Sequence, residues 1–261
     1  LASPAIAVIA FTLYFRAALF YDTQSPVQVL SILKPHLQLL MPEGDGPHPL
    51  IVSFHGCGGM TGYILPRAQI LADAGYAVLE VDSFTGRDID IGEACAGTDF
   101  QGGERAGDVL VALEHARTIP DIDHKRMFLQ GFSHGAWTVL EALAIPDGAA
   151  PSLDTDIANS MQGVQGAIAW YPYCGFGTGF GDGWRTDIPV LMLLAGKDET
   201  TAPEPCAKLA ELQMQKGGEV EMHLYPDATH GFDVDVDWVL NYVPETHQKS
   251  LGRLFEFLAR H

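Results

Sequence analysis

One serine of the chain lies in a short glycine-flanked motif whose spacing suits nucleophilic chemistry. The motif is Gly131-Phe132-Ser133-His134-Gly135, between an apolar run at residues 127–130 and a helical pattern over residues 134–145. This order predicts a strand, a sharp turn and a helix, and the glycines allow the close chain packing that such a turn needs. The turn would lift the serine hydroxyl above the sheet, beside a helix N-terminus that favours negative charge. Ser133 is therefore the candidate nucleophile, the alternative being a solvated serine in a glycine-rich turn.

A serine nucleophile needs a general base and a carboxylate that orients the base, and the chain offers both. Asp198 follows the predicted strand Val190–Ala195, and His230 follows the predicted strand Val220–Tyr225. The carboxyl ends of parallel strands lie on one edge of a sheet, so both side chains should reach Ser133. The order Ser, Asp, His along the chain is that of α/β-hydrolases. We predict a Ser133–His230–Asp198 catalytic triad and expect the carboxylates near it to be solvated loop residues: Glu199, Asp227 and Asp233.

Acyl transfer through a serine also needs hydrogen-bond donors for the oxyanion of the tetrahedral intermediate. The predicted strand Leu50–Phe54 runs into His55-Gly56-Cys57-Gly58-Gly59, a loop that can turn its backbone N–H groups toward the serine. We expect the N–H groups of Cys57 and His134 to form this oxyanion hole, and the side chain of His55 to act as a structural brace. Cys57 as the nucleophile is a weaker alternative, because no second histidine is placed to activate it.

The elements that must position these residues alternate along the chain. From residue 27 onward, apolar strands alternate with amphipathic helices, which predicts a mostly parallel central sheet with helices on both faces, an α/β fold. We assign residues 27–261 to one catalytic domain. The predicted strands cover residues 27–33, 37–41, 50–54, 76–81, 127–130, 164–170, 190–195 and 220–225, and the predicted helices cover 67–74, 104–118, 134–145, 204–215 and 248–259.

The N-terminal segment, residues 1–26, is unusually apolar. Residues 1–15 carry no charge, and Arg16 is followed by a second apolar stretch. The uncharged run is shorter than the roughly 20 residues that a membrane span needs. Three interpretations stay open: the remains of a signal or anchor segment, an apolar helix packed on the body or a partner, and a buried strand. Membrane contact is expected only through residues 1–21.

The charge balance restricts the function classes. The chain has 15 Lys and Arg against 33 Asp and Glu, a net charge of −18 over 261 residues. Nucleic acids and anionic membranes attract clustered cations, so neither is expected as the main partner. The balance suits an enzyme with a neutral or hydrophobic small-molecule substrate.

Together the motifs resemble the dienelactone hydrolase family of α/β-hydrolases. The matching stretches are the oxyanion loop, Val81-Asp82-Ser83-Phe84, the helix with Arg105 and Asp108, the serine motif, Tyr171-Pro172-Tyr173-Cys174, Gly196-Lys197-Asp198-Glu199, and residues 225–232. They span residues 38–258. The resemblance implies an α/β-hydrolase fold that acts on carboxylic esters or lactones without a cofactor or metal.

One residue departs from the pattern of the family. Members that open dienelactone use a cysteine nucleophile, whereas this chain has Ser133. The departure favours a general serine esterase; the alternatives are a dienelactone-type lactone hydrolase proper and a serine peptidase or acyl-peptide hydrolase of the same fold. Arg87 and Arg105 are candidates for holding a substrate carboxylate by residue type only, and Arg105 is expected to pair with Asp108.

The segment 173–187 links a strand end to the next strand and carries five glycines with aromatic residues between them. It suits a lid or a hydrophobic wall for an acyl group, although an ordinary surface loop is the alternative. The candidate substrate contacts are Tyr63, Phe180, Trp184 and Phe232, and Trp137 is a further aromatic that could line the pocket.

The chain has four cysteines, which allow three pairings into two disulfides. From the order of the strand ends, Cys57–Cys95 and Cys174–Cys206 are the preferred pairs if the protein is exported. Export to an oxidising compartment would agree with the apolar N-terminus, so an extracytoplasmic location is slightly favoured.

Overall fold

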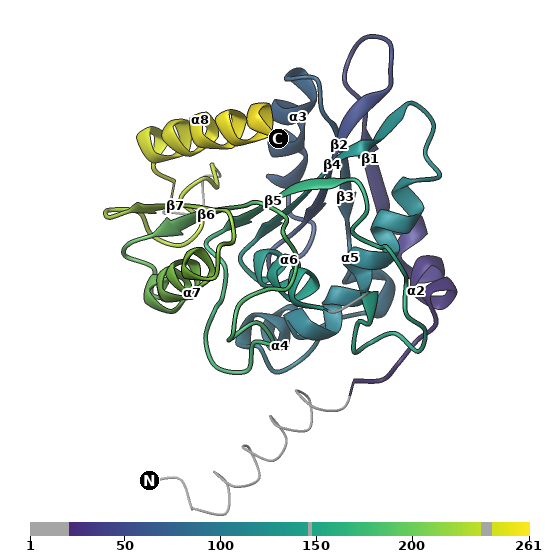
Figure 1. Cartoon of the computed structure of the whole chain (residues 1–261), viewed down its shortest axis with the longest axis horizontal. Helices are drawn as coiled ribbons and strands as arrows, with labels where there is room; N and C mark the ends of the chain where they lie inside the picture. The colour runs from purple at the N-terminus through teal and green to yellow at the C-terminus, as the bar shows by residue number, and fades with distance from the viewer. Residues whose placement is uncertain (1–20, 146–147, 236–241) are drawn as a thin grey trace, which may run out of the picture.

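Seven of the eight apolar runs predicted as strands pair into one seven-stranded sheet in the order β1-β3-β2-β4-β5-β6-β7 (Figure 1). The computed structural model describes residues 21–145, 148–235 and 242–261. β1 is antiparallel to β3, and the other neighbouring strands are parallel. The predicted mostly parallel sheet is therefore confirmed. The strands are β1 (Leu37–Leu40), β2 (His48–Phe54), β3 (Ala77–Val81), β4 (Ile122–Phe132), β5 (Val164–Trp170), β6 (Val190–Ala195) and β7 (Val220–Tyr225).

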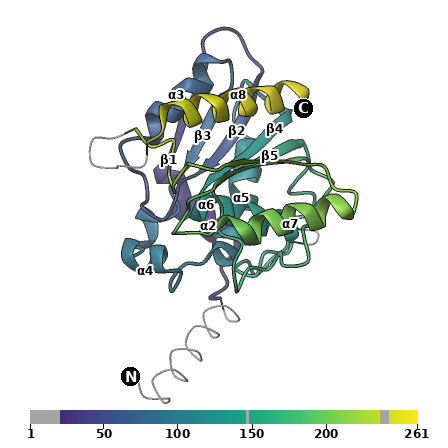
Figure 2. The same ribbon diagram turned by 90° about the vertical axis from the view of Figure 1, so that its left-hand side faces the viewer.

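Helices cover both faces of the sheet, as Figures 1 and 2 show from two directions. α3 (Ile64–Asp73) and α8 (Pro244–Arg260) lie on one face. The other face is covered by α2 (Pro26–Leu33), α5 (Gly102–Ala116), α6 (His134–Ala144) and α7 (Pro203–Gln215). The predicted arrangement of helices on both faces is confirmed.

Each central strand buries side chains on both of its faces. Ile51 and Phe128 pack in the core layer under α3 and α8, and Val52 and Leu129 pack in the layer with α5 and α6. Successive side chains of a strand point to opposite faces, so a strand covered on both sides reads as a continuous apolar run. Burial of each such side chain stabilises the fold by roughly 1.5–3 kcal/mol. The strand ends that carry the candidate site are thus anchored in a doubly covered core.

The prediction of a first strand at residues 27–33 is wrong, because this segment forms helix α2. Ser25 caps the helix: its Oγ accepts from the N–H of Gln28 at 3.2 Å, while its own N–H donates to Oε1 of Gln28 at 2.9 Å. Pro26 occupies the first turn. Val29 and Leu33, four residues apart, are the buried residues of the helix. Ser-x-x-Gln with a proline inside it is a helix-start signal, and it outweighs the β-rich composition here.

A short helix that the sequence analysis does not predict, α4 (Ile91–Ala96), lies after β3. Oδ1 of Asp90 accepts from the N–H of Glu93 at 2.9 Å and caps the helix, and Gly97 ends it with φ 68°. Only Ala94 of this helix is buried, so the segment lacks the apolar stripe by which longer helices are recognised. Three residues of α4, Ala94, Cys95 and Ala96, line a pocket beside Ser133.

The apolar segment 1–26 lies largely outside the described residues, so the three interpretations given for it stay open. At its end, Gln24 bridges to Leu153 and Pro26 begins α2. In the part of the chain that the structure describes, no helix has the length and apolar character needed to cross a membrane.

Candidate active site

Ser133 lies in the sharp turn between β4 and α6, with φ 52° and ψ −112°. The turn is possible because its neighbours are glycines. A Cβ on Gly131 would lie 2.3 Å from the carbonyl oxygen of Gly135, and a Cβ on Gly135 would lie 2.1 Å from that of Phe54. The N–H of Ser133 donates to the carbonyl of Trp170 in β5 at 2.9 Å. These contacts hold the hydroxyl at the carboxyl edge of the sheet.

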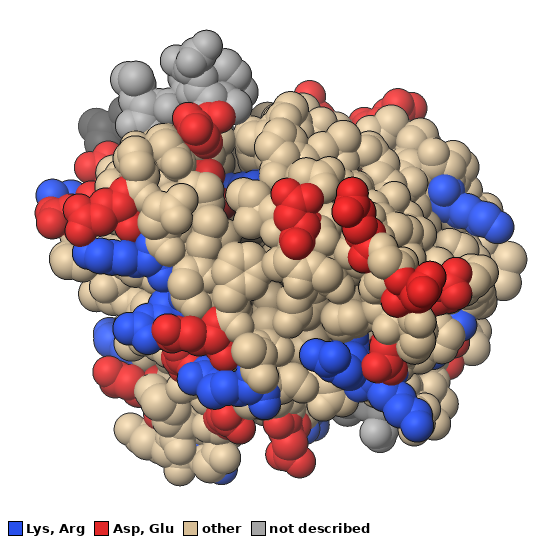
Figure 3. Space-filling view, turned by 90° about the horizontal axis from the view of Figure 1, so that it is seen from above, with Lys and Arg blue, Asp and Glu red and all other residues tan. Residues whose placement is uncertain are grey.

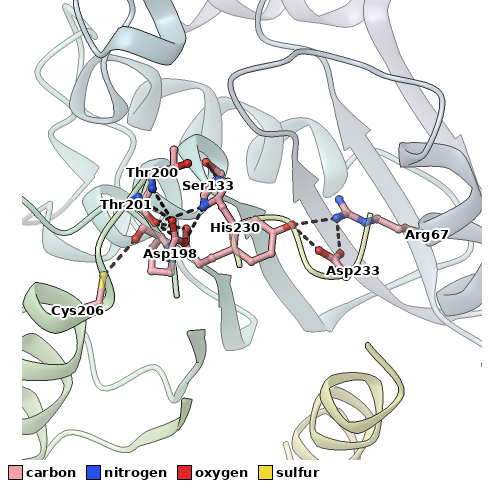
Figure 4. Close-up of polar contacts among 10 residues, drawn as sticks. Arg67, Ser133, Asp198, Thr200, Thr201, Cys206, His230 and Asp233 are labelled. Carbon is pink, nitrogen blue, oxygen red and sulfur yellow. Dashed lines mark hydrogen bonds and ion pairs between the residues drawn. The ribbon is translucent and has the colours of Figure 1, made fainter. Parts of the chain in front are cut away.

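The structure brings Ser133, His230 and Asp198 together in one chain of hydrogen bonds (Figure 4). Nε2 of His230 lies 2.8 Å from Oγ of Ser133, and Nδ1 lies 2.7 Å from Oδ2 of Asp198. When Nδ1 donates its proton to the carboxylate, Nε2 is left as the acceptor for the serine hydroxyl. This is the geometry that a serine nucleophile and its general base require.

Asp198 is held by the loop that follows it. Its Oδ1 accepts from the backbone N–H groups of Thr200 and Thr201, both at 2.9 Å, and its Oδ2 accepts from the hydroxyl of Thr201 at 2.9 Å. Burial by itself would raise the pKa of Asp198, but the hydrogen bonds from His230 and Thr201 outweigh it and lower the pKa. The carboxylate is therefore ionised and fixed in orientation at neutral pH.

Cys57 and His134, the predicted oxyanion donors, both border the same pocket as Ser133. His134 is the first residue of α6, and the N–H groups of a first helical turn have no partner within the helix. The loop before Cys57 is braced by His55, whose Nδ1 donates to the carbonyl of Gly56 at 2.7 Å and whose Nε2 accepts from the N–H of Ser83 at 3.3 Å. Burial lowers the pKa of His55 to about 4, so this brace is neutral.

The pocket beside Ser133 has a volume of about 180 Å³ and uncharged walls. Apart from the serine, its lining residues are Cys57, Ala94, Cys95, Ala96, Gly97, His134, Trp137, Tyr173, Thr200 and Thr201. Trp137 and Tyr173 form an aromatic pair with ring centroids 5.1 Å apart. The indole N–H of Trp137 donates to Glu141 at 2.7 Å, and the hydroxyl of Tyr173 donates to the carbonyl of Phe176 at 3.0 Å. The polar groups of both rings are thus engaged, so these rings offer mainly apolar surface to a ligand.

Among the described residues, no group of three or more His, Cys, Asp or Glu side chains is arranged to hold a metal ion.

The four residues predicted as substrate contacts do not line the pocket. Phe180 and Trp184 are 1% and 6% exposed, pack in the core with α5, α6 and α7, and are not among the pocket residues. Phe232 is fully buried among Trp170, Tyr171 and Tyr225, and Tyr63 stacks on Arg67. The predicted acyl wall is therefore not formed by these four residues. Trp137, which the sequence analysis names as a further aromatic, does line the pocket.

The loop 173–187 packs onto α6 because Glu141 holds it there. The N–H of Gly179 donates to Oε1 and Oε2 of Glu141 at 2.8 and 3.1 Å. A Cβ on residue 179 would lie 2.5 Å from Oε2 of Glu141, so a larger residue would require the Glu141 carboxylate to move. This contact draws the following Phe180 inward, and Tyr173 at the start of the loop remains at the pocket.

A second polar cluster lies behind the histidine, and it overturns the expectation that Asp233 is solvated. Asp233 is 4% exposed; its Oδ1 accepts from the hydroxyl of Tyr171 at 2.6 Å, and its Oδ2 pairs with Arg67 (Figure 4). The ring of Tyr171 packs edge-on against that of His230 at 4.8 Å, and the guanidinium of Arg67 lies 3.9 Å from the ring centroid of Phe132. The cluster ties the loop after His230 to the residue before Ser133.

Both predicted disulfides are present, Cys57–Cys95 and Cys174–Cys206. The Cys57–Cys95 bond joins the loop of residues 55–59 to α4. Cys57, Cys95, Ala96 and Gly97 therefore line the pocket as one covalently linked wall. The second joins the start of the loop 173–187 to α7. Two disulfides are consistent with an oxidising, extracytoplasmic location.

Loss of the first disulfide is expected to reduce activity more than loss of the second. The double variants Cys57→Ser/Cys95→Ser and Cys174→Ser/Cys206→Ser open loops of similar size, with sequence separations of 38 and 32. Each should therefore lose a similar stability, roughly 2–4 kcal/mol. Only loss of the Cys57–Cys95 bond allows the backbone at Cys57, with its N–H as a proposed oxyanion donor, to move. The kcat/KM of that double variant should therefore fall by about 10- to 100-fold, measured at a temperature where both variants are folded. Equal activity losses in the two variants would contradict this role.

Comparison with known proteins shows the family and the fold of the chain. A family model described as the dienelactone hydrolase family matches residues 37–261. A search of curated protein sequences found no match.

Solved structures resemble the chain in fold at low sequence identity. A protein assigned as a dienelactone hydrolase from Klebsiella pneumoniae has a TM-score of 0.69 at 17% identity, over 86% of this chain and 92% of that one. A dienelactone hydrolase-like promiscuous phosphotriesterase from metagenomic libraries has a TM-score of 0.68 at 18% identity, over 86% and 91%. An esterase from Thermogutta terrifontis with propionate bound has a TM-score of 0.61 at 20% identity, over 86% and 88%. Since the family model covers most of its length, the chain is a hydrolase with the α/β-hydrolase fold and belongs to the dienelactone hydrolase family.

Proposed function

We propose that this hydrolase cleaves small, uncharged carboxylic esters or lactones through an acyl-enzyme, with Ser133 as nucleophile, His230 as general base and Asp198 as the orienting acid. The observation that carries the proposal is the unbroken hydrogen-bond chain from Oγ of Ser133 through His230 to Asp198, beside a pocket. The use of serine in place of the cysteine of dienelactone-opening relatives supports a general esterase.

The reaction follows from this arrangement. Oγ of Ser133 attacks the carbonyl carbon as Nε2 of His230 takes the hydroxyl proton, and the carbonyl oxygen becomes an oxyanion that the N–H groups of Cys57 and His134 bind. His230 then gives the proton to the leaving alkoxide, and the acyl group stays on Ser133. A water molecule, deprotonated by His230, attacks the acyl-enzyme in the same way, and the carboxylic acid leaves.

The walls of the pocket favour a neutral substrate. None of the lining residues is Lys, Arg, Asp or Glu, so a carboxylate on the substrate would have no cation to pair with there. Arg87 and Arg105, the candidates by residue type for such a cation, are not among the lining residues. The esterase from Thermogutta terrifontis has been solved with propionate and with butyrate bound, which supports a short acyl group here.

Charge and disulfides support the proposed setting. The surface over α3 and α8 carries lysines and arginines interspersed with acidic side chains (Figure 3), and the net charge is −18. A small-molecule substrate rather than a nucleic acid suits this surface. The pair of disulfides suits a protein that works outside the cytoplasm, in the periplasm or in secreted form.

The test compares two aryl acetates that differ by one charge, 4-acetoxybenzamide and 4-acetoxybenzoate. After correction for their uncatalysed hydrolysis, kcat/KM for the neutral ester should be at least about tenfold higher, because the acidic ester would bring an unpaired carboxylate into an uncharged pocket. Repeating the comparison at high salt screens the overall negative field, and a difference that remains belongs to the pocket. Failure of the purified protein to hydrolyse either ester would contradict the proposed function, and equal rates would contradict the preference for neutral substrates.

A further inference from the structure

Arg105, in α5, is a fully buried cation that touches both sides of the candidate oxyanion hole. Its side chain is 0% exposed, and Nη1 donates to the carbonyl oxygen of His55 at 2.8 Å and to Nδ1 of His134 at 3.2 Å. His55 lies two residues before Cys57, and His134 directly follows Ser133. One guanidinium nitrogen therefore links the two segments that carry the proposed oxyanion donors, Cys57 and His134.

The charge of Arg105 is poorly compensated. Asp108, expected from the sequence to be its partner, instead forms a bidentate pair with Arg87 at 2.8 and 3.2 Å, which corrects that expectation. Nε and Nη2 of Arg105 have no hydrogen-bond partner among the described residues. The rings of Phe84 and Phe54 flank the guanidinium, with centroids 5.0 and 5.8 Å from Cζ. Burial lowers the pKa of Arg105 to about 9, and the nearby Asp108 partly opposes this, so the group is charged at neutral pH.

A buried cation without a paired carboxylate is unfavourable in the resting enzyme, and negative charge that develops nearby relieves this. In this site negative charge develops on the substrate oxygen in the transition state. Fixed positive charge near such an oxyanion acts in a low-dielectric environment and needs no reorganisation during the reaction. The charge of Arg105 therefore interacts more favourably with the transition state than with the resting site, which lowers the barrier.

We propose, on the basis of the esterase function above, that Arg105 is a positioning residue: it sets the spacing of the Cys57 and His134 N–H groups, and its charge favours the anionic tetrahedral intermediate. A purely structural arginine would stabilise the fold without distinguishing an anionic from a neutral ligand. The two roles therefore differ in their effect on an inhibitor that carries the oxyanion charge.

The experiment measures such an inhibitor in three variants. In phenylboronic acid, Oγ of Ser133 donates an electron pair to boron, the hydroxyl proton passes to His230, and the boron becomes tetrahedral and negatively charged with no bond broken at boron. Arg105→Met removes donor and charge, Arg105→Gln keeps a donor without charge, and Arg105→Lys keeps a charge. 4-Hydroxybenzamide, the neutral phenol product, serves as the uncharged competitor. Arg117→Met is the matched control, because Arg117 also holds carbonyl groups, those of Ser160 and Gln162, but does not line the pocket.

Arg105→Met should lower kcat for 4-acetoxybenzamide by about 100-fold with KM within about threefold, as expected for loss of oxyanion stabilisation. The inhibition constant of phenylboronic acid should rise at least about tenfold, and that of 4-hydroxybenzamide should stay within about threefold. Arg105→Lys should retain more activity and more boronate affinity than Arg105→Gln. The control variant should match the wild type in all four quantities.

Circular dichroism and thermal unfolding establish which variants are folded. If Arg105→Met does not fold, the comparison of Arg105→Lys with Arg105→Gln decides, since each can still donate to the His55 carbonyl. Equal weakening of the boronate and the neutral phenol, or equal behaviour of the Lys and Gln variants, would overturn the proposal. So would an unchanged kcat in Arg105→Met. Failure of the wild type to bind phenylboronic acid would instead contradict the serine esterase function itself.

Discussion

Replacing Ser133 by alanine is expected to lower kcat/KM for an aryl acetate by at least about 10⁴-fold. The change removes the oxygen proposed to form the acyl-enzyme and leaves His230 without the hydroxyl that it contacts at 2.8 Å. Alanine carries a Cβ as serine does and so keeps the strain of this turn, and among the described residues Oγ of Ser133 hydrogen-bonds only to His230. The thermal unfolding temperature should therefore change little.

The measurement is steady-state hydrolysis of 4-acetoxybenzamide by the two proteins, with the unfolding of each followed by circular dichroism. Ser31→Ala, an exposed serine of α2, is the control for the substitution itself and should leave kcat/KM unchanged. Retention of more than about a tenth of the wild-type activity in a folded Ser133→Ala variant would rule out this residue as the nucleophile.

Asp198→Asn is expected to lower kcat by about 10³- to 10⁴-fold, and the hydrogen bonds of the carboxylate give the reason. Oδ1 already accepts from the backbone N–H groups of Thr200 and Thr201, so the amide oxygen of asparagine takes that position. The amide NH₂ group then faces Nδ1 of His230, which must accept rather than donate. The imidazole proton moves to Nε2, and that nitrogen can no longer take the proton of Ser133.

The control for this change is Asp227→Asn, which removes a negative charge three residues before His230. Asp227 is exposed and pairs with Lys197 at the surface at 2.7 Å. Its loss should leave kcat within about twofold, because an exposed pair of this kind contributes little. If Asp198→Asn lowers kcat by less than about tenfold, the carboxylate does not orient the base. If both variants lose activity equally, general loss of charge near the loop is the cause.

The candidate triad could be predicted because its signals are local. Ser133 and Asp198 follow the buried strands β4 and β6, and His230 lies in the loop after β7, a half-buried strand at the edge of the sheet. Parallel strands bring their carboxyl ends to one edge whatever the loops do. The glycines around Ser133 are also a local signal, because a Cβ there would collide with the turn itself or with the neighbouring strand. The central strands could be predicted for the same reason, because strands buried on both faces have continuous apolar sequences.

The walls of the pocket could not be predicted, because long-range contacts decide them. Phe180 and Trp184 were expected to face the substrate, but the contact between Gly179 and Glu141, 38 residues apart, draws the loop onto α6. Asp233 was expected in solvent, and its burial depends on Arg67 in α3, far earlier in the chain. α4 lacks an apolar stripe, and its place at the pocket depends on the bond between Cys57 and Cys95. Composition and spacing carry no signal for the contacts of Glu141 with Gly179 and of Arg67 with Asp233. The disulfide itself could be predicted, but not that it brings α4 to the pocket.

At Ser133 the residue proposed for catalysis has a backbone conformation that lowers the stability of the fold. A side chain at φ 52° and ψ −112° costs of the order of 1–3 kcal/mol, a cost that glycine avoids. The proposed nucleophile is thus a residue that the fold alone would replace. A library of variants selected for heat resistance without a requirement for turnover would accumulate Ser133→Gly. The proposed nucleophilic role would therefore require selection for turnover to keep serine at this position.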